Sequence, residues 1–150
     1  MTRFNAIVEQ LTQARPLDEH NKALIEKIPV AYQSPASGLN DGGTVYLTPR
    51  GDATMFPGDE GVGIRTITDG ASRTIAMVEV DDAQAVPWTK PDDWKVDPLH
   101  AKVGFRGQYD NGMNTAFADG SVHFIAHAVD EKLLKALLTI QGREVIRLPF

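Results

Sequence analysis

Residues 114–126 read Asn-Thr-Ala-Phe-Ala-Asp-Gly-Ser-Val-His-Phe-Ile-Ala, and they give the clearest local structural signal in the chain. Asp119-Gly120 stands between two runs suited to β-strands, which is the strongest short signal for a β-hairpin. A two-residue turn would pair Ala118 with Ser121. Alternation then predicts a core face made of Thr115, Phe117, Val122 and Phe124. It predicts an opposite, solvent-side face made of Asn114, Ala116, Ala118, Ser121 and His123.

A leucine-rich helix is predicted directly after the hairpin. Asp130 is a suitable N-terminal cap, and Glu131 complements the helix dipole in the first turn. Gly142 is a suitable C-terminal stop, and residues 145–148 are interpreted as a short final strand. The buried stripe of the helix would consist of Leu133, Leu134, Leu137 and Leu138, with Lys132 and Lys135 on the opposite side.

Further strands are expected before the hairpin. Residues 74–80, Thr-Ile-Ala-Met-Val-Glu-Val, form a β-rich run that follows a turn at Asp69-Gly70. Shorter strands are expected over residues 44–48 and 62–67. The rest of the region from 34 to 63 is rich in turn-forming residues and is interpreted as loops.

The N-terminal region predicts two helices. The first is amphipathic and covers residues 4–14, because its apolar side chains recur at helical spacing and Pro16 ends it. The second would start at Asp18 and end at Ile28, before Pro29. The apolar positions of the first helix are Phe4, Ile7, Val8 and Leu11.

This order of elements predicts one domain over residues 1–150, with the leading amphipathic helix in 1–16 and the main body over 17–150. Helices at both ends and several strands between them favour an α+β fold over a doubly wound parallel sheet. We therefore expect an antiparallel β-sheet that is packed by N-terminal and C-terminal helices.

Composition excludes several functional classes. The chain has 150 residues, no cysteine and a formal net charge of −5. Disulfide scaffolds, cysteine-based metal sites and thiol catalysis are therefore excluded. The acidic balance argues against nucleic-acid binding, which uses a basic stripe. The longest early apolar run, residues 6–8, is far too short for a secretion signal or a membrane-spanning helix, so we expect no membrane span in this chain.

Histidines and acidic residues are the candidate metal ligands of this sequence. His123 and His127 are four residues apart, but in a strand that spacing separates them by about 13 Å, so we expect no metal site there. Two acidic clusters, residues 79–82 and 92–97, offer oxygen ligands of the kind calcium prefers, yet neither has the spacing of a calcium-binding loop. No cofactor is therefore expected, and calcium is kept as the alternative.

The loop that contains both tryptophans is the candidate binding segment. Trp88 and Trp94, flanked by prolines, have the amphipathic rings that line sugar or peptide grooves, although such residues also pin long loops to a sheet. Lys90, from the same loop, and Tyr109 complete the candidate binding residues. No catalytic residues are predicted.

Several segments together resemble a known family. They are residues 20–25 (His-Asn-Lys-Ala-Leu-Ile), 67–75 (Ile-Thr-Asp-Gly-Ala-Ser-Arg-Thr-Ile), 86–93 (Val-Pro-Trp-Thr-Lys-Pro-Asp-Asp), 117–122 (Phe-Ala-Asp-Gly-Ser-Val) and 142–145 (Gly-Arg-Glu-Val). In this order they resemble the planctomycete-type domain of unknown function 1559 family, which is prepilin-like. Many of its members carry a His, nine residues, then Asp-Gly. Here the position ten residues before Asp119 is Tyr109.

The resemblance implies a pilin-like or pseudopilin-like architecture at the cell surface or in the periplasm. It implies a non-enzymatic structural or interaction module with protein partners or self-association, and no enzymatic activity. The missing His puts any metal role of that motif in question, and the missing apolar anchor leaves a cytoplasmic location open. Two alternatives remain open: a small-ligand or glycan-binding domain using Trp88 and Trp94, and a metal-dependent hydrolase.

Overall fold

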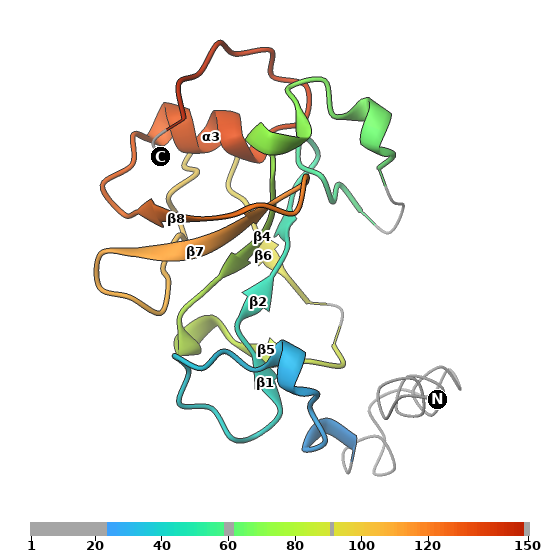
Figure 1. Ribbon diagram of the computed structural model, residues 1–150, viewed down its shortest axis with the longest axis vertical. Helices are drawn as coiled ribbons and strands as arrows, with labels where there is room; N and C mark the ends of the chain where they lie inside the picture. Colours follow the sequence, from blue (N-terminus) through green and yellow to red (C-terminus); the bar gives the residue numbers. More distant parts are fainter. Residues whose placement is uncertain (1–23, 59–61, 91, 149–150) are drawn as a thin grey trace.

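The computed structural model describes residues 24–58, 62–90 and 92–148, and its centre is a four-stranded antiparallel sheet (Figure 1). The strands follow the order β2-β4-β7-β8, so β2 and β8 form the two edges. Their bounds are Tyr46–Leu47 for β2, Ile75–Glu79 for β4, Gly112–Phe117 for β7 and Val122–Ala126 for β8. The helix α3, Glu131–Leu138, follows β8. The mixed α+β class expected from the sequence is confirmed.

The helix α3 supplies one wall of the hydrophobic core. Leu134, Leu137 and Leu138 are at most 1% exposed and belong to one cluster with Ile75 and Phe117 of the sheet. Burial of such side chains is the main stabilising term in folding, at roughly 1.5–3 kcal/mol for each fully buried side chain. The core face of the sheet is therefore the face that α3 covers.

The start of α3 agrees with the sequence prediction, but its end does not. Asp130 Oδ1 accepts hydrogen bonds from the amides of Lys132 at 2.9 Å and Leu133 at 3.1 Å, so the predicted cap is confirmed. The helix ends at Leu138, well before Gly142. Thr139 is in an extended conformation, and the Ile140 amide donates a hydrogen bond to the Ala53 carbonyl instead of to the helix. The predicted strand over 145–148 is wrong, since these residues form no strand.

The hairpin exists as predicted, but its register differs by one residue. Ala116 pairs with Val122 and Thr115 pairs with His123. A loop of three residues, Ala118 to Gly120, replaces the expected two-residue turn, and Gly120 adopts a φ of +86°. The prediction that Val122 and Phe124 lie in the core is wrong: the shift turns them to the other face, where they are 64% and 41% exposed.

The strand β4 confirms the predicted run at 74–80 and adds a β-bulge. Ile75 pairs with Phe117 and Met77 pairs with Ala116, so Ala76 is an extra residue without a partner of its own. Strict alternation would put Ile75 and Glu79 on the same face. The bulge instead keeps Ile75 in the core and turns Met77 and Glu79 to the uncovered face.

The region before β4 differs from the sequence prediction. The expected strand over 44–48 is divided into short strands, because β1 (Gly43–Thr44), β2 and the neighbouring β3 (Pro49–Arg50) each pair with a different strand. The expected strand over 62–67 is wrong, since Ile64–Thr66 forms the 3-10 helix η2. The other short pairs are β1 with β5 (Val86–Pro87), antiparallel, and β3 with β6 (Trp94–Lys95), parallel. The other 3-10 helices are η1 (Val30–Tyr32), η3 (Ala71–Arg73) and η4 (Asp82–Gln84).

The two predicted N-terminal helices fall mostly outside the described residues. The helix over 4–14 lies outside them entirely, and the second is described only from Leu24, where Leu24 and Ile25 are helical. The predicted turn at Asp69-Gly70 is present: Gly70 has a φ of +98°, and the Asp69 carboxylate accepts bonds from the amides of Gly142 and Arg143. Over the described ranges, no helix has the length and apolar character needed to cross a bilayer.

Candidate functional site

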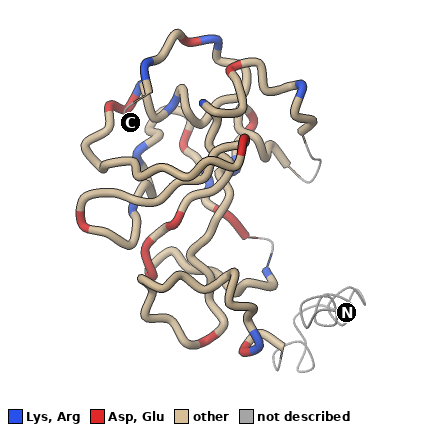
Figure 2. The backbone as a smooth tube through the Cα atoms, viewed as in Figure 1, with Lys and Arg blue, Asp and Glu red and all other residues tan. Residues whose placement is uncertain are grey.

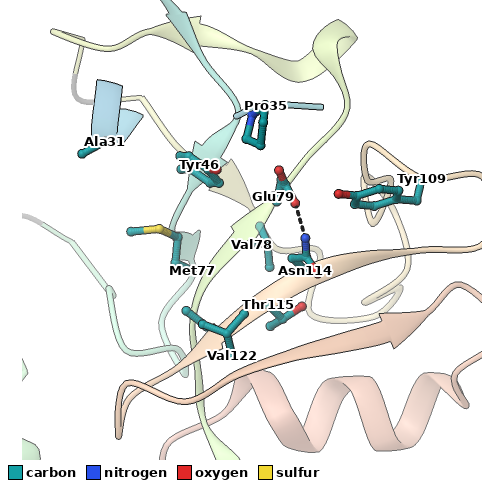
Figure 3. A pocket seen from close by; sticks show the side chains of 11 residues that line it. Ala31, Pro35, Tyr46, Met77, Val78, Glu79, Tyr109, Asn114, Thr115 and Val122 are labelled. Atoms are coloured by element: carbon teal, nitrogen blue, oxygen red, sulfur yellow. Dashed lines mark hydrogen bonds between the residues drawn. The ribbon is translucent and has the colours of Figure 1, made fainter. Parts of the chain in front are cut away.

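Within the described residues, no helix packs across the face of the sheet opposite α3, and this face carries a cavity of about 430 Å³ (Figure 3). We call this surface the open face. Residues from four strands contribute to it, and the η1 segment and a loop close its rim. The open face consists of Tyr46, Met77, Glu79, Asn114, Ala116, Val122 and Phe124, with Ala31, Pro35 and Tyr109 at the rim of the cavity.

Glu79 lines this cavity and is only 4% exposed. Its carboxylate accepts a hydrogen bond from the Ser34 hydroxyl and another from Asn114 Nδ2 at 2.7 Å. Both donors are neutral, and among the described residues no Lys, Arg or His forms an ion pair with Glu79. Buried carboxylates are normally paired with a cation. The cavity therefore presents an anionic group that the described part of the chain leaves without a counter-ion.

Two tyrosines flank the carboxylate. Burial raises the pKa of Tyr46 above its ordinary value of 10.0, the hydrogen bond with Ser34 acts against this, and the nearby Glu79 raises the pKa further. Tyr46 therefore keeps its proton at neutral pH. The hydroxyl of Tyr109 points toward Glu79 in Figure 3, and its ring stands edge-on to Phe124 with centroids 5.9 Å apart. Tyr109 is thus one sequence-predicted binding residue that the structure places at the cavity.

Exposed apolar side chains share the open face with the carboxylate, and Met77 and Val122 line the cavity itself. Met77 is 39% exposed, Val122 is 64% exposed and Phe124 is 41% exposed. Exposed apolar side chains gathered around a concave polar group are typical of binding surfaces, because a ligand can bury the former while it pairs with the latter.

The two tryptophans do not share an open groove. Trp94 is 5% exposed, its indole N–H donates to the Val103 carbonyl at 3.1 Å, and its ring packs against Phe105. Trp88 is half-buried, and its indole N–H donates to the Ile25 carbonyl at 2.9 Å. Both rings tie long loops to the body of the molecule. Lys90 forms a surface ion pair with Asp92 at 2.7 Å, away from the cavity lining.

The histidines also stay apart. His123 lies on the core side of β8, which corrects the prediction of a solvent-side position, and its ring stands edge-on to Phe117. His127 packs against Phe105 instead, and its Nε2 accepts a bond from the Gly107 amide at 3.4 Å. Within the residues that the structure describes, no three His, Asp or Glu side chains converge as metal ligands.

The acidic clusters are engaged in internal hydrogen bonds. Asp82 accepts bonds from the Ser37 hydroxyl and from Gln108 Nε2. Although burial acts to raise the pKa of Asp93, the Thr48 amide and the Arg50 guanidinium hold it below its ordinary value of 3.8. These carboxylates therefore fasten loops to one another.

The comparisons with known proteins add no relative. A scan against protein-family models gives no match, and the searches of curated proteins and of solved structures give none either.

Proposed function

We propose that this chain is a non-enzymatic interaction module of the pilin-like type, and that its open face binds a partner protein. In this proposal, a lysine side chain or an amino terminus of the partner enters the cavity and pairs with Glu79. The resemblance seen in the sequence supports the class of module and a location at the cell surface or in the periplasm. The observation that carries the binding role is the buried Glu79 carboxylate, which no cationic side chain of the described residues pairs with.

A primary ammonium group matches the chemistry of the cavity. It carries three donors. From the described residues, the Glu79 oxygens receive only the bonds of Ser34 and Asn114, so they retain further acceptor capacity. The aromatic rings at the rim can add cation–π attraction, which contributes about 0.5–2 kcal/mol depending on solvent exposure. The methylene stem of a lysine would lie against Met77 and Val122, which supply apolar contact area.

The positions of the tryptophans and histidines argue against the two alternative functions, a glycan-binding domain and a metal-dependent hydrolase. A glycan groove through Trp88 and Trp94 would need both rings at the surface, but Trp94 belongs to the core. A metal-dependent hydrolase through His123 and His127 would need the two imidazoles to converge, but each packs against a different phenylalanine.

The test uses n-hexylammonium as a stand-in for a lysine side chain, with n-hexanol as its neutral counterpart. Each is titrated into the full chain, and the amide shifts of residues on the open face are followed by NMR. We expect n-hexylammonium to perturb the amides of Ala116 and Val122 and to bind more tightly than n-hexanol. In Glu79→Gln, we expect its affinity to fall about 10–100-fold, because a charge-assisted hydrogen bond contributes about 1.5–3 kcal/mol.

The matched control is Glu131→Gln, which removes the same charge from an exposed position at the start of α3. It should bind n-hexylammonium like the wild type. Equal affinities for the amine and the alcohol, or equal affinities of the wild type and Glu79→Gln, would show that Glu79 is not a cation-binding group.

A further inference from the structure

The strand β8 is a sheet edge, and the described residues leave its outer backbone groups unpaired. The Phe117 amide donates to the Ser121 carbonyl at 2.9 Å, so these two residues form a hydrogen-bonded pair. In an antiparallel ladder such pairs alternate, so His123 and Ile125 also bond to β7. The N–H and C=O groups of Val122 and Phe124 therefore point away from the sheet, and no described residue bonds to them.

This edge lacks the devices that usually protect an edge strand. Natural edges are guarded by Lys, Pro, bulges or a covering segment. The sequence of β8 is Val-His-Phe-Ile-Ala, and its pairing with β7 runs without a bulge. The tube through β8 carries no Lys, Arg, Asp or Glu along its length (Figure 2). Four of its five residues are exposed or half-buried.

We infer that β8 pairs antiparallel with β8 of a second copy of this chain. A two-fold axis through His123 would set Val122 opposite Phe124 of the partner subunit, and Phe124 opposite Val122 of the partner subunit. Both pairs use the outward-pointing backbone groups, so they are hydrogen-bonded pairs. The two four-stranded sheets become one continuous eight-stranded sheet.

The side chains favour a second copy as the occupant of this edge. Val122 and Phe124 both project from the open face and are 64% and 41% exposed. The two-fold arrangement packs the aliphatic side chain of one copy against the aromatic ring of the other, and such cross-strand pairs stabilise a sheet by about 0.2–1 kcal/mol each. The edge is thus complementary to itself. This inference rests on the strand edge and does not require the proposed cation site, although Val122 belongs to both surfaces.

The test measures the mass of the full chain by sedimentation equilibrium over a range of concentrations. We expect a monomer–dimer equilibrium in the wild type. Val122→Lys places a charge where the two β8 strands meet, and it should lower the dimer affinity at least tenfold. Val145→Lys is the matched control, because Val145 is fully exposed at a site outside β8 and the change is chemically the same.

A second variant, Phe124→Pro, tests the backbone pairing itself. The Phe124 amide points outward. Proline therefore removes one hydrogen-bond donor between the two β8 strands and leaves the bonds between β7 and β8 intact. We expect a folded monomer, checked by circular dichroism; should this variant not fold, Val122→Lys still decides the question. A wild type that is monomeric at every concentration would overturn the inference. So would an assembly that grows beyond the dimer, or equal dimer affinities of Val122→Lys and Val145→Lys.

Discussion

The amide of Phe117 donates to the carbonyl of Ser121 at 2.9 Å, and the amide of Gly120 donates back to the carbonyl of Phe117 at the same distance. These two bonds close a loop of three residues, a common hairpin connection that needs a left-handed residue at its last position. The register of β8 follows from this loop. The loop therefore determines that Val122 and Phe124 lie on the open face.

The first prediction concerns this loop. Gly120→Val should lower the free energy of unfolding by about 1–2 kcal/mol, because a side chain at a φ of +86° crowds the following carbonyl. Gly120→Asn should lose less, since Asn tolerates this conformation. Urea denaturation of the variants measures both effects.

Gly58→Val is the control for this pair of variants, because Gly58 has open space around it and no positive φ. It should unfold at the same urea concentration as the wild type. If Gly120→Val and Gly58→Val unfold alike, the assigned loop conformation is incorrect.

The second prediction concerns the cap of α3. Asp130→Ala should lower stability by about 1 kcal/mol, because the amides of Lys132 and Leu133 lose their acceptor. Asp130→Asn keeps a side-chain oxygen at the same position and should retain most of the stability. The midpoint of urea denaturation distinguishes the two variants. A loss in Asp130→Asn as large as that in Asp130→Ala would argue for a charge effect in place of a hydrogen-bonded cap.

The third prediction separates the structural role of Glu79 from its proposed binding role. Glu79→Ala should destabilise the chain by about 1–3 kcal/mol, because the Ser34 hydroxyl and the Asn114 amide lose a buried acceptor. Glu79→Gln should lose less, since its carbonyl can accept one bond and its amide can donate to the Ser34 oxygen. Thermal unfolding measures the difference, and equal losses in the two variants would contradict the hydrogen-bonded network.

The fourth prediction is a pH dependence at Asp82. Hydrogen bonds from the Ser37 hydroxyl, Gln108 Nε2 and the Gly38 amide hold the pKa of Asp82 below its ordinary value of 3.8. A carboxyl whose pKa is lower in the folded chain stabilises the fold above its unfolded pKa and loses that contribution as the pH falls through the folded pKa. The stability difference between the wild type and Asp82→Ala should therefore be constant near neutral pH and shrink below about pH 4. Urea denaturation at pH 7 and pH 3 measures it, and a constant difference would contradict the assignment.

Local signals predicted the elements better than their registers. The hairpin, the run that forms β4 and the start of α3 each depend on a few neighbouring residues, and each is found as predicted. The predicted length of the hairpin loop is wrong, because Asp-Gly suits both a two-residue turn and the end of a three-residue loop. Val122 and Phe124 are apolar, so alternation alone assigned them to the core.

The candidate site could be predicted only in part. The place of Tyr109 before Asp119-Gly120 distinguishes it in the sequence, whereas Glu79 is distinguished there only as a member of an acidic cluster. A lone charged residue within the apolar run 75–80 was the available signal. Its position in the cavity depends on the bulge at Ala76 and on Ser34, which is distant in sequence, and neither follows from local pattern.

The central strand β4 has consequences for how the chain reaches this structure. Its two neighbours in the sheet, β2 and β7, are both remote in sequence (Figure 1). Tyr46 pairs with Glu79, and Ile75 pairs with Phe117. Among the pairs of the four-stranded sheet, only that of β7 with β8 is joined by a tight turn. Non-local pairing requires long stretches of chain to close into loops before the strands make contact, and the entropy cost of this closure slows refolding. Stopped-flow experiments should therefore give a refolding time of milliseconds to seconds, as for other proteins with non-local strand pairing. We expect the hairpin of β7 and β8, whose strands are neighbours in sequence, to form before β4 and β2 join the sheet.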